Sequence, residues 1–183
     1  KASSEGIVRH FAYVAEHSEL PLIVYNVPGR TGVSCTPEHY ARLAEIPRIN
    51  GVKEASGDIS LVSRTRYLCG DALNIWSGND DQTLPMLALG AKGVISVASN
   101  IVPQVMATLC AAALSGDFFT ARAVHEAYAG LFDALFYEVN PIPVKSAMQM
   151  LGWDSGRLRL PLCPMAEGNA AKLQNCLESL QLL

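Results

Sequence analysis

Residues 49–58 read INGVKEASGD, a short apolar run that closes on Lys53 and then on a Ser-Gly-Asp turn. Short apolar segments bounded by turn residues are typical of buried parallel strands. Three other segments of the chain share this pattern. We therefore expect four buried strands, at residues 20–27, 49–55, 73–79 and 91–99. Lys53 lies at the carboxyl end of the second.

Helical patterns alternate with these strands, at residues 5–17, 37–46, 59–68 and 81–89. Pro37 follows Thr36, which is a good N-cap residue with proline at the first helical position. Beyond residue 99 the strand pattern stops. The remaining patterns are helical, at residues 103–114, 117–138, 142–151 and 164–180.

Strands that alternate with helices indicate an α/β protein with a parallel sheet. Four such units make half of a (β/α)8 TIM barrel, which typically needs about 250 residues. A small open doubly wound sheet is the alternative, but its G-x-G-x-x-G fingerprint is absent. We predict a partial barrel over residues 1–115 and a helical C-terminal region over residues 116–183.

The composition narrows the class of protein further. Half of the 183 residues are hydrophobic, 17% are charged and the net charge is −3, which predicts a folded domain without an electrostatic footprint for nucleic acid or membrane. No apolar run reaches the length of a membrane span, and the N-terminus does not resemble a signal peptide. Five cysteines without a C-x-x-C pair give neither metal-ligand spacing nor a disulfide framework. We expect a reduced, cytoplasmic protein.

The position of Lys53 at the end of a buried strand suits a reactive amine better than a solvated surface charge. An exposed lysine has a pKa of about 10.4, whereas burial and nearby positive charge can lower it to about 7–8. The neutral amine can then attack a carbonyl and form a Schiff base. The alternative is a lysine whose stem lies along apolar surface while its ammonium reaches water.

The ends of the other strands carry further candidate residues. Strand alternation places Tyr25 beside Lys53, where a phenol can relay protons, unless its ring only fills the interior. Arg30 follows in a Pro-Gly turn and can hold a carboxylate or be simply solvated. Gly78 allows backbone to approach a ligand, and the aspartates after it suit helix capping. Lys145, in a proline-rich bend, reads as structural.

Five ordered segments carry a family resemblance. They read YNVPGRTG (25–32), GVKEASGD (51–58), SGND (77–80), GVISV (93–97) and NPIPVK (140–145). In sequence and spacing they resemble the dihydrodipicolinate synthase family, which belongs to the pyruvate-dependent class I aldolases. The resemblance covers essentially the whole chain, and it implies a lyase of lysine and diaminopimelate biosynthesis.

The resemblance also implies residue roles. Lys53 would form the imine with pyruvate, Tyr25 would relay protons, and Arg30 would bind the carboxylate of aspartate-4-semialdehyde. The backbone at Ile95 would lie against pyruvate, while Gly78 and Asn79 would line the aldehyde side. The product would be 4-hydroxy-tetrahydrodipicolinate. The family's chemistry needs no metal or organic cofactor, and its members are homo-oligomers, either dimers or tetramers.

The resemblance further implies that this chain corresponds to the C-terminal half of the barrel. The family's first strands, its threonine pair and a second tyrosine from a dimer partner lie in an N-terminal half without a counterpart here. A half barrel exposes sheet edges that invite pairing with another chain. We therefore expect this chain alone to self-associate and to have little turnover.

Two other functions fit the same residues. The first is another pyruvate aldolase, such as an N-acetylneuraminate or keto-sugar-acid lyase, although sialic acid lyases generally lack an arginine at the position of Arg30. The second is a pyruvate-binding or assembly module without turnover. Aldehyde acceptor tests separate the first from the synthase, and an imine on Lys53 without product would support the second.

Overall fold

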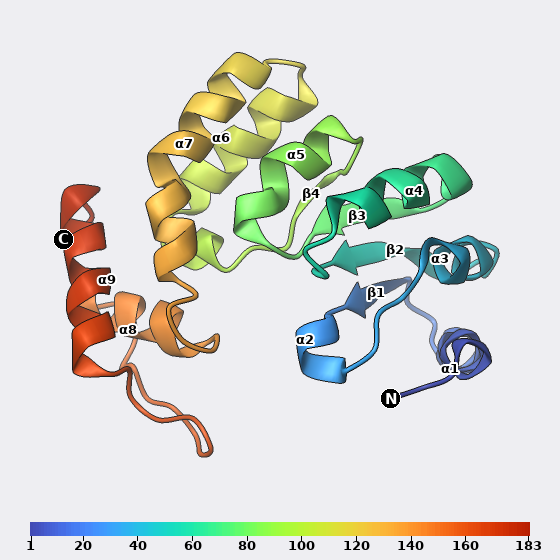
Figure 1. The fold of residues 1–183 in the computed structure, drawn as a ribbon, viewed down its shortest axis with the longest axis horizontal. Helices are drawn as coiled ribbons and strands as arrows, with labels where there is room; N and C mark the ends of the chain where they lie inside the picture. Colours follow the sequence, from blue (N-terminus) through green and yellow to red (C-terminus); the bar gives the residue numbers. More distant parts are fainter. The chain divides into compact units, whose positions relative to one another are not determined.

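The structure, a computed structural model, describes all residues from Lys1 to Leu183. It contains two compact units, Lys1–Ile95 and Ser96–Leu183, and each is described by itself (Figure 1). The predicted barrel segment, residues 1–115, covers the first unit and the beginning of the second. None of the helices is both long and apolar enough to cross a membrane.

The first unit is built on a four-stranded parallel sheet. Its strands are β1 (Leu22–Asn26), β2 (Ile49–Glu54), β3 (Asn74–Ser77) and β4 (Gly93–Val94). They pair in sequence order, β1-β2-β3-β4, so each strand lies beside the next one along the chain. This arrangement confirms the predicted α/β class with a parallel sheet.

Helices connect the strands as predicted. They are α1 (Ser4–Glu16) before β1, then α3 (Pro37–Ala44), α4 (Ile59–Cys69) and α5 (Thr83–Ala88). Thr36 caps α3 through its side chain, with Pro37 at the first helical position, as its sequence indicates. Asp58 caps α4 by accepting a hydrogen bond from the amide of Leu61 (3.1 Å).

Two short helical turns follow strand ends; the first was not predicted, and the second was predicted only as part of the helix over residues 81–89. They are α2 (Pro28–Thr31), which follows β1, and the 3-10 turn η1 (Asp80–Gln82), which follows β3. Gly32, with φ of 69°, ends α2 in the left-handed conformation. The aspartates after Gly78 form η1 rather than capping α5, whose N-cap residue is Gln82.

The sheet has one face packed on helices and one open face. Val24, Val52 and Ile75 are register partners on the packed face, where each is at most 2% exposed. They share a core with apolar side chains of α1, α3, α4 and α5 (Ile7, Val8, Leu43, Val62 and Met86). Because strand residues alternate between faces, their neighbours Tyr25, Lys53 and Trp76 share the opposite face.

The last strand is shorter than predicted. Only Gly93 and Val94 form β4, although the apolar run extends over residues 91–99. The amide of Ile95 still donates to the carbonyl of Ser77 (2.8 Å), but the chain then coils into the 3-10 turn η2 (Ala98–Asn100). The hydroxyl of Ser96 accepts the amide of Ser99 (2.8 Å), which favours this turn over a longer strand.

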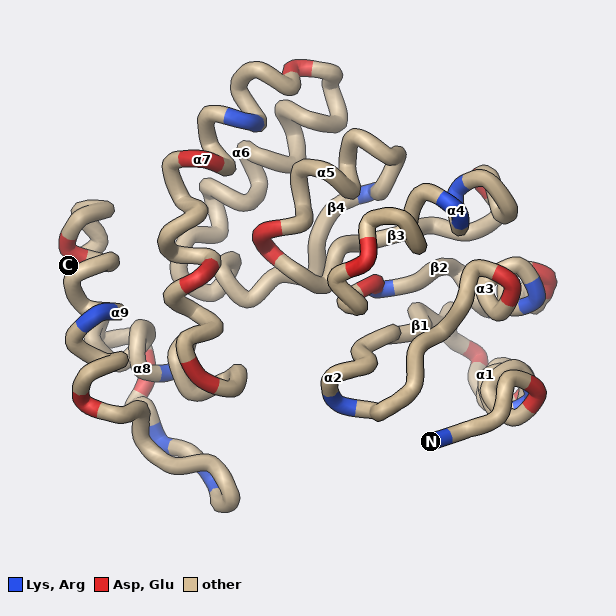
Figure 2. Tube along the Cα trace, in the orientation of Figure 1, with Lys and Arg blue, Asp and Glu red and all other residues tan.

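The second unit is helical. Its helices are α6 (Pro103–Leu114), α7 (Phe118–Ala134), α8 (Ile142–Met150) and α9 (Glu167–Ser179). α6 packs on α7, and α9 packs on both α7 and α8. The helices lie where the sequence places them, although α7 and α9 are shorter than predicted. Figure 2 shows basic and acidic segments interspersed along the helices.

Candidate functional site

Lys53 and Tyr25 meet at the carboxyl end of the sheet. They are register partners on β2 and β1, and the Nζ of Lys53 lies 4.2 Å from the centroid of the Tyr25 ring. Lys53 is half-buried, whereas Tyr25 is 43% exposed. An ammonium at this distance over an aromatic face is attracted by the ring. The predicted proximity of these two side chains is therefore present.

Trp76 flanks Lys53 on the other side and was not predicted. It is the register partner of Lys53 on β3, and of Gly93 on β4. A Cβ added at Gly51 would lie 2.6 Å from Cζ3 of Trp76, and one at Gly93 would lie 3.5 Å from its Cδ1. The two glycines thus make room for the indole on the face of the sheet that carries Lys53.

Gly78 lies directly beneath the stem of Lys53. A Cβ added at Gly78 would come within 2.7 Å of the Cβ of Ala55 and 3.1 Å of the Cε of Lys53. The amide of Gly78 donates to the carbonyl of Glu54 (2.7 Å), which holds this turn against the end of β2. The absence of a side chain at position 78 therefore permits the observed course of the lysine.

Burial and two charges set the protonation of Lys53. Removal from water lowers the pKa of the amine below its ordinary value, and this is the largest influence on it. The Asp80 carboxylate opposes the shift, whereas the positive charge of Arg30 adds to it. Asp80 is buried in η1 and Arg30 is exposed on α2, so each of these short turns carries a charge that acts on Lys53.

Asn79 and Ile95 are both anchored to Ser77 at the end of β3. The hydroxyl of Ser77 donates to the carbonyl of Asn79 (2.6 Å), and its own carbonyl accepts the amide of Ile95. The Ile95 side chain is 40% exposed. The structure thus brings Tyr25, Lys53 and Gly78 into direct proximity, while Arg30 acts on the lysine through its charge.

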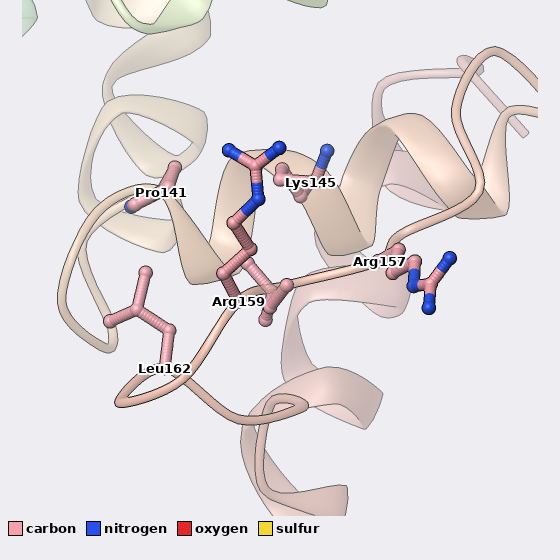
Figure 3. Close-up of a pocket in the computed structure, with 6 residues that line it drawn as sticks. Pro141, Lys145, Arg157, Arg159 and Leu162 are labelled. Carbon is pink, nitrogen blue, oxygen red and sulfur yellow. The ribbon is translucent and has the colours of Figure 1, made fainter.

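The second unit contains a cavity of about 710 Å³ that includes none of these residues. It is lined by Pro141, Lys145, Arg157, Leu158, Arg159 and Leu162. Figure 3 shows the Arg159 side chain extending toward the helix that carries Lys145, while Arg157 points the other way. Lys145 forms an ion pair with Asp154 (3.0 Å), which agrees with a structural role.

The site has the parts required for attack on a carbonyl. A half-buried amine with a lowered pKa can act as a nucleophile, and a phenol can donate or accept a proton. An arginine suits recognition of a carboxylate. No group of three or more His, Cys, Asp or Glu side chains is arranged to hold a metal ion.

The fold and the site together define an α/β protein with a half-buried lysine beside a tyrosine ring at the carboxyl end of a parallel sheet. A model of the dihydrodipicolinate synthetase family matches residues 1–180. The chain belongs to that family.

The relatives are similar over the entire chain. The 4-hydroxy-tetrahydrodipicolinate synthase of Geobacter sulfurreducens is 48% identical over 183 residues, which are 100% of this chain and 63% of the relative. A crystal structure of dihydrodipicolinate synthase from Thermotoga maritima superposes with a TM-score of 0.97 at 44% identity, again over 100% of this chain and 63% of that one.

A chloride-inhibited dihydrodipicolinate synthase from Acinetobacter baumannii, solved in complex with pyruvate, matches equally well. Its TM-score is 0.98 at 40% identity, over 100% of this chain and 63% of that chain. The chain thus spans about 63% of the length of these relatives.

Proposed function

We propose that this chain carries the Schiff-base centre of a 4-hydroxy-tetrahydrodipicolinate synthase, a lyase of lysine and diaminopimelate biosynthesis. Its substrates are pyruvate and aspartate-4-semialdehyde. The observation that carries the proposal is the half-buried Lys53, whose pKa is lowered mainly by burial, in contact with the ring of Tyr25. The family and the relatives named above support the same chemistry.

The neutral amine of Lys53 attacks the ketone carbon of pyruvate, and loss of water gives an iminium ion. The iminium accepts the electron pair of a methyl C–H bond as the proton leaves, which yields an enamine. The enamine carbon attacks the aldehyde, and the substrate amine then closes the ring and releases Lys53. Tyr25 moves the protons of these steps, because a phenol both donates and accepts.

Arg30 holds the carboxylate of the aldehyde substrate in this proposal. Its guanidinium can form two parallel hydrogen bonds with a carboxylate. Gly78 and Asn79 line the aldehyde side, and the backbone at Ile95 lies against pyruvate. The anchoring of Asn79 and Ile95 to Ser77 supports a fixed position for both.

Residues 1–115 form the last four βα units of a (β/α)8 barrel in this proposal, and residues 116–183 form its C-terminal helical region. β1 and β4 are the edge strands of the described sheet. An edge strand offers unpaired backbone groups to another strand. In this proposal the further strands of the barrel pair with these edges. We also propose, from the family resemblance, that the protein is a homo-oligomer and that it is cytoplasmic.

A pyruvate aldolase with a sugar acceptor is not favoured. Its acceptor carries hydroxyl groups, whereas Arg30 presents a guanidinium near Lys53 and acts on the charge of that amine. A carboxylated aldehyde is the better match for this side chain.

Incubation of the purified chain with carbon-13-labelled pyruvate and a choice of aldehydes tests the proposal by NMR. We expect a condensation product with aspartate-4-semialdehyde, formed slowly because we expect little turnover from this chain alone. We expect none with N-acetylmannosamine and none from a Lys53→Arg variant. A product from the sugar alone would overturn the assignment in favour of a sialic acid lyase. An imine without any product would indicate a pyruvate-binding module.

A further inference from the structure

Glu54 follows Lys53 in β2 and lies on the opposite face of the sheet. It is 2% exposed, which is rare for a carboxylate. None of the chain's salt bridges includes it. A buried charge without an ion-pair partner costs free energy unless hydrogen bonds compensate it.

Three neighbouring residues donate hydrogen bonds to this carboxylate. Nδ2 of Asn26 lies 3.0 Å from Oε1 and 3.1 Å from Oε2, and the Tyr40 hydroxyl lies 2.5 Å from Oε2. The Ser56 amide donates to Oε1 at 2.7 Å. Every partner is a donor, which suits an ionised carboxylate, because that group only accepts.

Tyr40 is held in the donor state. Burial, together with the nearby Glu54 carboxylate, raises the pKa of the Tyr40 phenol far above its ordinary value. The phenol is 1% exposed and belongs to α3. The carboxylate therefore fastens α3 to the end of β2 through a persistent hydrogen bond.

The same carboxylate joins the ends of β1 and β2. Asn26 is the register partner of Glu54. Asn26 directly follows Tyr25 on β1, and Glu54 directly follows Lys53 on β2. Oδ1 of Asn26 accepts the amide of Cys35 (3.0 Å), so the loop before α3 is tied in as well. One buried group thus connects two strands, one helix and two loops directly behind the reactive pair.

We propose that Glu54 is a positioning residue, which fixes the ends of β1 and β2 so that Lys53 and Tyr25 meet in the geometry that imine formation requires. This inference rests on the proposed function of Lys53. Well-packed apolar residues often stabilise a core as well as buried ions do, so stability alone does not account for a carboxylate here. Displacement of a reacting group by about 1 Å can cost about 10²-fold in rate.

Three variants of the full chain separate positioning from stability. Glu54→Gln keeps the shape but replaces one acceptor oxygen with a donor, in a site where only donors face it. Tyr40→Phe keeps the charge and the other hydrogen bonds. Thr65→Val is the matched control, because Thr65 is 1% exposed and its hydroxyl donates to the Leu61 carbonyl within α4 (2.8 Å), away from this network.

The first readout is the rate at which borohydride traps pyruvate on Lys53, as a function of pyruvate concentration and pH. For Glu54→Gln we expect a maximal rate about 10- to 100-fold lower, with a smaller change in the half-saturating pyruvate concentration. The pH midpoint stays in place, because burial, Asp80 and Arg30 set the charge of Lys53. The maximal trapping rate falls less than tenfold in Tyr40→Phe, and in Thr65→Val it stays within about twofold of the wild-type rate.

The second readout is amide hydrogen exchange, which needs no substrate. In Glu54→Gln we expect exchange about tenfold faster in residues 49–58 and unchanged in α4. The inference would be overturned if residues 49–58 of Glu54→Gln exchanged at the wild-type rate. It would also be overturned if the trapping rate of Glu54→Gln fell no further than that of Thr65→Val. A wild-type protein that traps no pyruvate would instead contradict the proposed function, and exchange would still decide whether Glu54 fixes the strand ends.

Discussion

The amine of Lys53 lies 4.2 Å from the centre of the Tyr25 ring, and the two residues pair in register across β1 and β2. The backbone hydrogen bonds of two parallel strands thus determine which side chain faces the lysine. The Tyr25 side chain stands at the open face of the sheet, where it is 43% exposed.

Substitution Tyr25→Phe tests the proton relay. The ring and its contact with Lys53 remain, but the hydroxyl is lost, so we expect imine formation to slow by about 10²- to 10⁴-fold. Borohydride trapping kinetics measure the effect, and circular dichroism verifies the fold. A phenylalanine variant that reacts at the wild-type rate would show that Tyr25 only fills space.

Arg30→Gln and Asp80→Asn should shift the pH dependence of imine formation in opposite directions. Arg30 lowers the pKa of Lys53 and Asp80 raises it, although burial is the largest influence. Only the neutral amine reacts. Loss of Arg30 therefore moves the rise in trapping rate to higher pH, and loss of Asp80 moves it to lower pH.

The control for this pair is Arg9→Gln, because Arg9 forms an exposed ion pair with Glu5 on α1. Its pH profile should match that of the wild type. Shifts of the same sign in Arg30→Gln and Asp80→Asn would contradict the electrostatic account.

Gly78→Ala should disturb Lys53 directly. The added methyl group would lie 2.7 Å from the Cβ of Ala55 and 3.1 Å from the Cε of Lys53. We expect a loss of about 1–3 kcal/mol in the free energy of unfolding from overpacking, together with slower trapping. Gly29→Ala is the matched control, since a Cβ added at Gly29 would meet nothing within 4 Å. Equal behaviour of the two variants in denaturant titrations and trapping would count against this geometry.

Substitution Arg30→Lys separates the binding of the substrate carboxylate by Arg30 from the effect of its positive charge on Lys53. Lysine keeps the positive charge but lacks the planar fork that binds a carboxylate with two hydrogen bonds. Hydrogen bonds to charged groups contribute about 1.5–3 kcal/mol, so the KM for the carboxylated aldehyde should rise about 10- to 100-fold. The pH profile of pyruvate trapping should stay unchanged, and steady-state kinetics with a varied aldehyde concentration measure the effect. An unaltered KM would remove Arg30 from the proposed substrate site.

Local sequence patterns predicted the strands and the main helices because each has a strong periodic or capping signal. The pattern around Lys53 and the cap at Thr36 are examples. The apolar run after Val94 misled the prediction of β4, since the serine hydroxyl at position 96 closes a turn there. α2 was missed because it spans only four residues, too few for a periodic signal. η1 was not separated from the predicted helix over residues 81–89 because it spans only three.

The contact between Tyr25 and Lys53 was predictable because strand alternation applies to both residues. Alternation places Tyr25 beside Lys53, and the same rule applied to β3 would have added Trp76. The hydrogen bonds of Glu54 join residues far apart in the chain, so no local sequence pattern predicts them. Nor does sequence alone show that the charges of Arg30 and Asp80 act on one amine.

Reduction with borohydride in the presence of pyruvate, followed by peptide mass spectrometry, tests the central claim most directly. The account predicts a single stable adduct, on the peptide that contains Lys53, and none in Lys53→Arg. A folded protein without an adduct, or with one on Lys92 or Lys145 instead, would contradict the assignment of Lys53 as the Schiff-base residue.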